Sequence, residues 1–164
     1  MPSAFLVFIP CFYHRLQGMP EPQIVLGFDV SINRVGVAIG NCITRDARPL
    51  LQINSRDKHY RFNEIQRLIS EWEPQALIVG VPSHADGTAL PNTSFCLRFA
   101  NQLRGRFARP VIEVNENYST VVARSEAGMD LEDETDAWSA VCVLEQYLQD
   151  PQQSASVSRI GIHR

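Results

Sequence analysis

Short apolar runs open the chain and predict its first elements. The run at 24–29 is almost continuously apolar and ends in the carboxylate of Asp29, which is typical of a strand buried on both faces. Two further strand patterns, at 35–40 and 50–53, follow after turn-length polar segments, as in an antiparallel meander. We therefore predict three antiparallel strands at the start of the fold.

Helical and strand patterns alternate in the rest of the chain. Apolar residues recur at helical spacing from Phe62 to Trp72, and Pro74 ends that helix. The runs at 76–81 and 111–114 are typical of buried strands. A helix between these two strands has its apolar face at Cys96, Phe99, Ala100, Leu103 and Phe107.

The last helix is predicted from apolar positions near the C-terminus. Its apolar face consists of Ala137, Ala140, Val141, Leu144 and Leu148, with Thr135 as the N-cap. Before it we expect a short helix at 119–126 and an acidic loop at 128–133. The element order β-β-β-α-β-α-β-α-α predicts an α/β fold, with a five-stranded mixed sheet and helices on both faces.

Composition limits the class of protein. The chain has 164 residues, 45% of them hydrophobic and 20% charged, which suits one soluble globular domain. Its apolar runs fall short of the ~20 residues that cross a bilayer, so we expect no membrane contact. The spacing of the four cysteines fits neither a zinc site nor a dense disulfide framework, which indicates a cytoplasmic protein with reduced thiols. These residues are Cys11, Cys42, Cys96 and Cys142.

Turn-forming Gly and Pro residues and a polar C-terminal stretch divide the chain into three segments. Residues 1–22 are expected to be an N-terminal extension, either a short ordered arm or sequence upstream of a true start at Met19. Residues 23–150 form the predicted domain, and the polar segment 151–164 is expected to be a frayed tail.

Charge is distributed unevenly. Residues 34–109 hold 11 Lys or Arg against 6 Asp or Glu, whereas residues 110–150 hold 1 against 10. The basic part suits a polyanion and the acidic part suits hydrated cations, but a solvated surface of mixed sign explains the same pattern. The net charge of -3 argues mildly against tight, non-specific binding of nucleic acid.

Carboxylates are the candidate chemical groups. Asp29 ends the first strand, Glu116 follows the fifth, and Asp136 lies in the first turn of the last helix. Reactive groups of open α/β sheets gather beyond the carboxyl ends of the strands. Taken singly, Glu116 is explained as a solvated loop acid and Asp136 by the helix dipole, whereas a buried carboxylate such as Asp29 needs a compensating cation or donors.

Brought together, the three acids would raise one another's pKa unless divalent cations lay between them. Oxygen-only ligands favour Mg²⁺ or Mn²⁺. Two such ions about 3.5–4 Å apart activate water and stabilise the leaving oxygen in phosphodiester hydrolysis.

Six segments carry a resemblance to a known family. The order of elements resembles the RNase H-like superfamily, and residues 23–149 resemble the YqgF-type family, which is described both as Holliday junction resolvases and as pre-16S rRNA nucleases. The matching segments are GFDVSINRVGVAIG (27–40), ARPL (47–50), IVGVPSHADGTALP (78–91), RFANQLRGRF (98–107), VNENYSTVVAR (114–124) and TDAWSAVCVLEQYL (135–148).

The resemblance implies a catalytic role for the three acids. Asp29, Glu116 and Asp136 match the family's metal-binding positions and would position a water for in-line attack on a phosphodiester. The implied function is a metal-dependent nuclease that trims the 5′ end of the precursor of small-subunit ribosomal RNA. Alternatives are a nuclease acting on branched DNA and a catalytically degenerate module that binds nucleic acid or acts in transcription. We expect a monomer or a weak homodimer.

The sequence departs from the family around these acids. Ser31-Ile32-Asn33 replaces the usual Gly-Thr-Lys, Asn115 and Asn117 replace an Asp and an Arg, and the segment 130–134 is acidic where the family is basic. Such changes affect substrate affinity and rate before they affect metal ligation.

Arginines provide a candidate surface for nucleic acid. Arg98, Arg104, Arg106 and Arg109 surround the end of the second predicted helix, and with Arg34 they would track phosphates. A solvated helix end explains the same residues. The loop Asp86-Gly87-Thr88 resembles the family's loop beside the active centre, although Asp-Gly also favours a simple turn.

Overall fold

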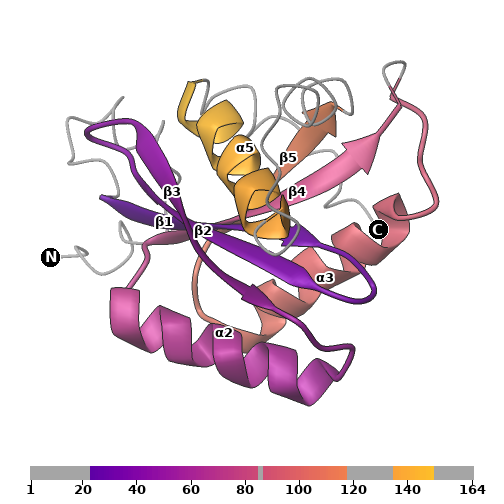
Figure 1. The fold of residues 1–164 in the computed structure, drawn as a ribbon, viewed down its shortest axis with the longest axis horizontal. Coiled ribbons are helices and arrows are strands. Elements are labelled where there is room, and N and C mark those ends of the chain that lie inside the picture. The colour runs from indigo at the N-terminus through magenta and orange to yellow at the C-terminus, as the bar shows by residue number, and fades with distance from the viewer. Residues whose placement is uncertain (1–22, 85–86, 118–134, 150–164) are drawn as a thin grey trace, which may run out of the picture.

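A computed structural model describes residues 23–84, 87–117 and 135–149, and the structural statements below concern these ranges. The elements follow in the order β1 (Ile24–Val30), β2 (Val35–Asn41), β3 (Asp46–Ile53), α2 (Lys58–Trp72), β4 (Ala76–Ser83), α3 (Thr93–Arg106), β5 (Val111–Asn117) and α5 (Thr135–Gln149). The five strands form one sheet in the order β3-β2-β1-β4-β5 (Figure 1).

The sheet is mixed, with β1 at its centre. β1 pairs antiparallel with β2, from Ile24 opposite Asn41 to Val30 opposite Val35, and β2 pairs antiparallel with β3. On its other edge β1 pairs parallel with β4, and β4 pairs parallel with β5. The helices α2 and α3 make the crossovers to these parallel strands. This arrangement confirms the predicted three antiparallel strands followed by parallel ones.

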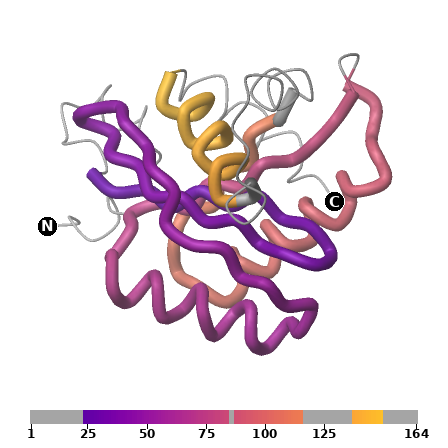
Figure 2. The backbone as a smooth tube through the Cα atoms, viewed as in Figure 1, coloured from indigo at the N-terminus to yellow at the C-terminus, as the bar shows by residue number. Residues whose placement is uncertain are grey.

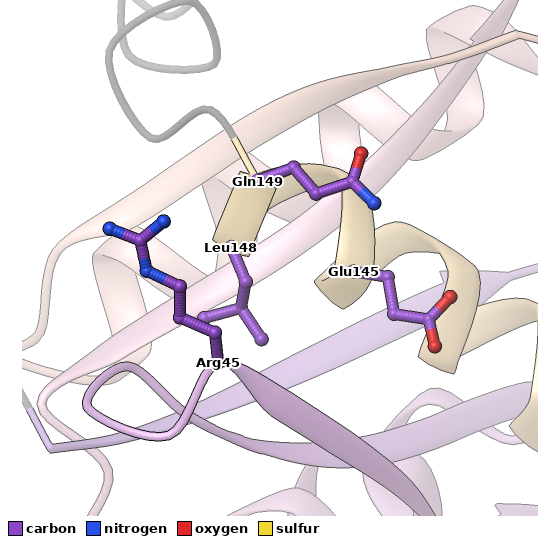
Figure 3. Close-up of a pocket in the computed structure, with 4 residues that line it drawn as sticks. All are labelled: Arg45, Glu145, Leu148 and Gln149. Atoms are coloured by element: carbon purple, nitrogen blue, oxygen red, sulfur yellow. The ribbon is translucent and has the colours of Figure 1, made fainter.

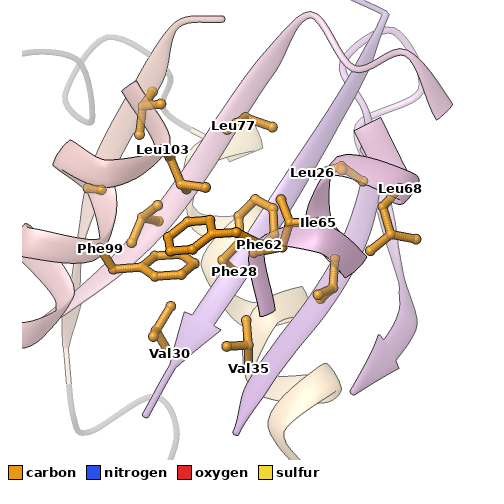
Figure 4. Close-up of a cluster of buried hydrophobic side chains, with 14 of the residues drawn as sticks. Leu26, Phe28, Val30, Val35, Phe62, Ile65, Leu68, Leu77, Phe99 and Leu103 are labelled. Atoms are coloured by element: carbon orange, nitrogen blue, oxygen red, sulfur yellow. The ribbon is translucent and has the colours of Figure 1, made fainter. Parts of the chain in front are cut away.

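Side chains of β1 alternate between two cores. Leu26, Phe28 and Val30 belong to a cluster that includes the buried faces of α2 and α3. There the rings of Phe62 and Phe99 stack with centroids 5.5 Å apart (Figure 4). Val25 belongs to the other cluster, which includes the apolar face of α5. Helices therefore cover both faces of the sheet, as predicted (Figure 2).

Helix α5 approaches the sheet closely because glycine lies beneath it. A Cβ atom added to Gly27 would lie 2.8 Å from Cδ2 of Leu144 and still closer to its Cγ. The last turns of α5 lie near the β2–β3 turn, where Arg45, Glu145, Leu148 and Gln149 line a cavity of about 430 Å³ (Figure 3). This turn lies at the amino end of β1, so α5 runs opposite to β1 and begins near its carboxyl end.

Several boundaries differ from the prediction. β3 begins at Asp46 rather than at residue 50. Among the described residues it pairs only with β2, and such an edge strand tolerates Pro49 and exposed charges. β1 continues through Val30, and β5 extends to Asn117, so Glu116 lies within a strand rather than after it.

Helices α2 and α3 begin before their first periodic apolar residues, and α2 is capped by Asp57, whereas α5 begins at Thr135, the residue predicted as its N-cap. The N-terminal extension, the helix at 119–126, the loop at 128–133 and the tail lie outside the described residues. Within the described ranges, the helices are too short or too polar to cross a membrane.

Candidate active site at the carboxyl ends of the strands

Asp29 is a partly buried carboxylate near the carboxyl end of the central strand. It pairs with Gly36 of β2 and follows Phe28, the last residue of β1 in register with β4. Strand alternation places Asp29 on the same face as Val25 and Gly27, which is the face covered by α5. Asp29 also has an interaction with another part of the protein. It thus occupies the predicted place in the fold.

Glu116 lies two strands away from Asp29. Its backbone pairs with Pro82 of β4, the strand between β1 and β5. Two inter-strand spacings amount to about 10 Å. Extending the β1–β4 register sets Asp29 level with Gly80, whose partner on β5 is Val114, so Glu116 lies further toward the carboxyl end of the sheet.

Asp136 opens α5 at the same end of the sheet. It precedes Leu144, which contacts Gly27, by about two helical turns, or roughly 12 Å along the axis. Gly27 precedes Asp29 by about 6.6 Å of strand. Since α5 runs opposite to β1, its first turn lies beyond Asp29.

The backbone therefore carries all three predicted ligand positions to one end of the sheet. The side chains of Glu116 and Asp136 lie outside what the structure describes. Among the described side chains, none of the His, Cys, Asp and Glu residues form a group of three that is placed to hold a metal. The metal-binding set of Asp29, Glu116 and Asp136 thus stays a prediction.

A closed turn follows Asp29 and joins β1 to β2. Ser31 donates its N–H to the carbonyl of Arg34 at 2.9 Å, and its hydroxyl accepts from the N–H of Arg34 at 3.1 Å. Arg56 donates to the side-chain oxygen of Asn33 at 2.6 Å. The turn is thereby fixed to the segment that precedes α2.

Arg61 is a buried cation that sequence analysis missed. It is 5% exposed and donates to the carbonyl of Ile32 at 2.5 Å and to the carbonyl of Ser55. Burial lowers the pKa of its guanidinium from the ordinary value, although an arginine stays charged at neutral pH. The sequence does contain a signal for this burial. Arg61 lies four residues before Ile65 and seven before Leu68, a spacing that places its charge on the apolar face of α2.

The structure does not bring the predicted arginines together. Arg104 donates to Glu113 at 2.9 Å and to the carbonyl of Val111, the first residue of β5, at 3.0 Å. Arg109 donates to the carbonyl of Pro74, just before β4, at 2.7 Å. These residues therefore hold the amino ends of the parallel strands, opposite to Asp29.

The direction of α3 explains this separation. The helix begins near the carboxyl end of β1, where Asn92 donates to the carbonyl of Val30 at 3.2 Å. Its length of about 20 Å carries Arg106 to the far end, where the guanidinium lies 4.3 Å from the ring centroid of Phe62. Arg98 is exposed between the two ends, and Arg34 lies two residues before Gly36, the strand partner of Asp29.

The segment after β4 turns back tightly at the same end as Asp29. His84 donates its N–H to the carbonyl of Thr88, and Gly87 donates its N–H to the carbonyl of His84, each at 2.9 Å. Gly87 has φ of 88°, a conformation that glycine tolerates best. Asp86 lies outside the described residues, so the role predicted for this loop stays a prediction.

Comparison with known proteins identifies the family. The sequence model of the RuvX family, described as Holliday junction resolvase, matches residues 23–150. The chain belongs to the RuvX family. A relative from Paraburkholderia xenovorans (strain LB400) is 47% identical over 126 residues, which cover 76% of this chain and 86% of the relative. A relative from Paraburkholderia phytofirmans is 48% identical with the same coverage, and both are named "Putative pre-16S rRNA nuclease".

A solved structure supports the RuvX-family fold. Thermus thermophilus RuvC in complex with a Holliday junction substrate matches with a TM-score of 0.51 at 15% identity, covering 81% of this chain and 98% of RuvC. This likeness concerns the fold alone. The predicted RNase H-like sheet and the family resemblance are thus confirmed.

Proposed function

We propose that this RuvX-family protein is a metal-dependent nuclease that processes the 5′ end of pre-16S rRNA in the cytoplasm. The observation that carries the proposal is Asp29, a partly buried carboxylate at the carboxyl end of the central strand. The names of the relatives support the substrate, and the family match supports phosphodiester cleavage.

The chemistry of the donors fits Mg²⁺ or Mn²⁺. Asp29, Glu116 and Asp136 offer only carboxylate oxygens, the ligands that these hard cations prefer. We propose that these residues hold two ions, which supply Lewis acidity and lower the pKa of bound water when present. Asp29 is the central ligand in this proposal because it lies on the innermost strand.

The protein's own residues orient the substrate around this site. The turn after β1 is fixed by Arg56 and Arg61, so Arg34 projects from a rigid support near Asp29. A cation in this place neutralises a phosphate next to the one that reacts. We propose this positioning role for Arg34.

The test is cleavage of a labelled pre-16S 5′ leader RNA with Mg²⁺ or Mn²⁺. Asp29→Asn is expected to lower the rate by about 10²–10³-fold, as for loss of one group that stabilises the transition state. The matched control is Asp46→Asn, because Asp46 is exposed at the far end of the meander. Calorimetric titration with Mn²⁺ supplies a second readout, in which Asp29→Asn lowers ion affinity. Equal cleavage by wild type and Asp29→Asn contradicts the proposal.

Branched DNA is the second candidate substrate, because the matched family is described as Holliday junction resolvase. A labelled four-way junction therefore forms a parallel arm of the assay. Faster cleavage of the junction than of the RNA leader would favour this function. Binding of either substrate without cleavage in any metal would favour the degenerate, non-catalytic module.

A further inference from the structure

The β1–β2 turn and the start of α2 expose an unusual combination of side chains beside the candidate active site. We propose that Ile32, Arg34, Arg56, Lys58 and Tyr60 form a docking surface for an unpaired nucleic-acid strand. We call these five residues the turn–helix surface. The inference rests on the proposed function for the class of partner, and it adds where and in which form the strand binds.

The two parts of this surface are held together by hydrogen bonds. Arg61, which follows Tyr60 in α2, donates to the carbonyl of Ile32 at 2.5 Å. Arg56 donates to Asn33, the next residue of the turn, at 2.6 Å. The turn and the start of α2 lie on the same side of the molecule, at the right of the view (Figure 1). The surface is therefore formed before any ligand binds.

The apolar members are unusually exposed. Ile32 is 59% exposed and Tyr60 is 52% exposed, although most large apolar residues among the described ones are buried. Bases in single strands present unpaired faces that stack on aromatic and apolar side chains, whereas a duplex hides these faces. Exposed Ile32 and Tyr60 thus suit an unpaired strand.

Three exposed cations lie within four residues of Ile32 or Tyr60 in the sequence. Arg34, Arg56 and Lys58 are exposed, and they offer three positive charges to a phosphate backbone. The acid nearest to them in sequence, Asp57, uses its carboxylate to cap α2 by accepting from the N–H groups of His59 and Tyr60. Charge complementarity therefore favours a polyanion over an apolar peptide.

The surface continues directly from the candidate site. Val30 ends β1 immediately after Asp29, and the turn begins at the following residue. A strand whose reacting phosphate lies at Asp29 would meet the turn with its neighbouring nucleotides. The turn–helix surface would thus select substrates that are unpaired next to the cleaved bond.

Binding of short fluorescent oligonucleotides to the full-length chain tests the proposal. The probes are a labelled oligouridine and a labelled RNA duplex of the same length, titrated in EDTA and followed by fluorescence anisotropy. Tyr60→Ala and Ile32→Ser are each expected to weaken oligouridine binding about tenfold and to leave duplex binding unchanged. Tyr60→Phe keeps the ring and is expected to bind like wild type.

Matched controls lie away from the surface. Ile43→Ser removes an apolar side chain that is 66% exposed in the β2–β3 turn, at the other end of the strands. Arg67→Ala removes an arginine of α2 that pairs with Glu64 and Glu71 at 3.0 and 3.3 Å. Arg56→Ala, by contrast, is expected to lower the salt slope of binding by about 0.7. Melting temperatures confirm that every variant is folded.

Two results would overturn the docking surface. One is oligouridine binding by Ile32→Ser and Tyr60→Ala that equals binding by Ile43→Ser. The other is an equal loss of single-strand and duplex binding, which would show that the residues do not distinguish unpaired bases. If wild type cleaves the RNA leader while these variants bind and cleave normally, the surface fails and the proposed function stands. If the variants lose binding as expected but wild type cleaves nothing, the surface stands and the nuclease proposal fails.

Discussion

Replacing Gly27 by alanine tests how the sheet positions α5. The added Cβ would lie 2.8 Å from Cδ2 of Leu144 and closer still to Cγ, whereas carbon atoms in contact are normally about 3.5–4.0 Å apart. Rotation about χ2 of Leu144 leaves Cγ in place, and rotation about χ1 would drive a fully buried side chain into the packed core around it. Helix α5 or strand β1 must move by about 1 Å, and we expect a loss of about 3 kcal/mol in the free energy of unfolding.

The same displacement should reach the candidate site. Asp136 is carried by α5, and a shift of about 1 Å in a reacting group lowers rates by roughly 10²-fold. Cleavage by Gly27→Ala should therefore fall by that factor per folded molecule, at temperatures well below its unfolding transition. A correctly folded variant with full activity would show that α5 does not position a catalytic group.

A double-mutant cycle measures the clash directly. Leu144→Ala removes the atoms that the new Cβ would meet, at a cost of about 2–5 kcal/mol for the cavity. The double variant should be more stable than the sum of the single effects by about 2–3 kcal/mol. Urea unfolding followed by circular dichroism supplies the free energies.

The control for this cycle is Gly105→Ala. A Cβ at Gly105 in α3 meets nothing within 4 Å, so this change should be neutral or stabilising by up to about 1 kcal/mol. Additive effects of the Gly27 and Leu144 changes would refute the reasoning.

Three further predictions concern other described contacts. Arg104→Ala should lower the free energy of unfolding by about 2–3 kcal/mol, less than the loss of a fully buried pair because Arg104 is partly exposed. Cleavage per folded molecule should stay unchanged, so weaker RNA binding at unaltered stability would contradict this prediction. Arg61→Met should lower the free energy of unfolding in urea by about 3 kcal/mol, because the carbonyls of Ser55 and Ile32 lose a charged donor. An unchanged free energy of unfolding would contradict this prediction. Asp57→Ala should lower the free energy of unfolding by about 1 kcal/mol and weaken oligouridine binding, because Tyr60 lies in the helical turn that Asp57 caps. Hydrogen exchange of that turn measures the loss of stability, and fluorescence anisotropy measures the loss of binding.

The sequence was most informative where an element is buried. β1, β4 and the apolar helix faces follow from continuous or periodic hydrophobicity, and the structure confirms them. The first half of β3 was missed because its residues are partly exposed and include Pro49. The end of β5 was missed because Asn115-Glu116-Asn117 is polar, and only pairing with β4 extends the strand. Such extensions depend on partners that the local pattern does not contain.

The site was predictable in part for the same reason. Asp29 stands out because a carboxylate closely follows a buried run. Arg61 did not stand out, since its partners Ile32 and Ser55 are contributed by segments that only the fold brings near. Arg34 and Arg104 were expected on one surface, but they lie at opposite ends of the sheet. The sequence shows that Arg104 is near the end of a helix, but it does not show which end of the sheet that helix reaches.

The central place of β1 affects how the chain emerges during synthesis. The hydrogen-bonding groups on one edge of β1 pair with β2, which follows directly in the chain. The groups on the other edge pair with β4, which begins only at Ala76. A nascent chain that ends after α2 thus presents an open strand edge flanked by apolar side chains, a template for self-association. Arrival of β4 closes that edge, and arrival of α5 then buries the remaining apolar face. Translation pauses placed before β4 would prolong the interval in which a growing polypeptide depends on chaperones.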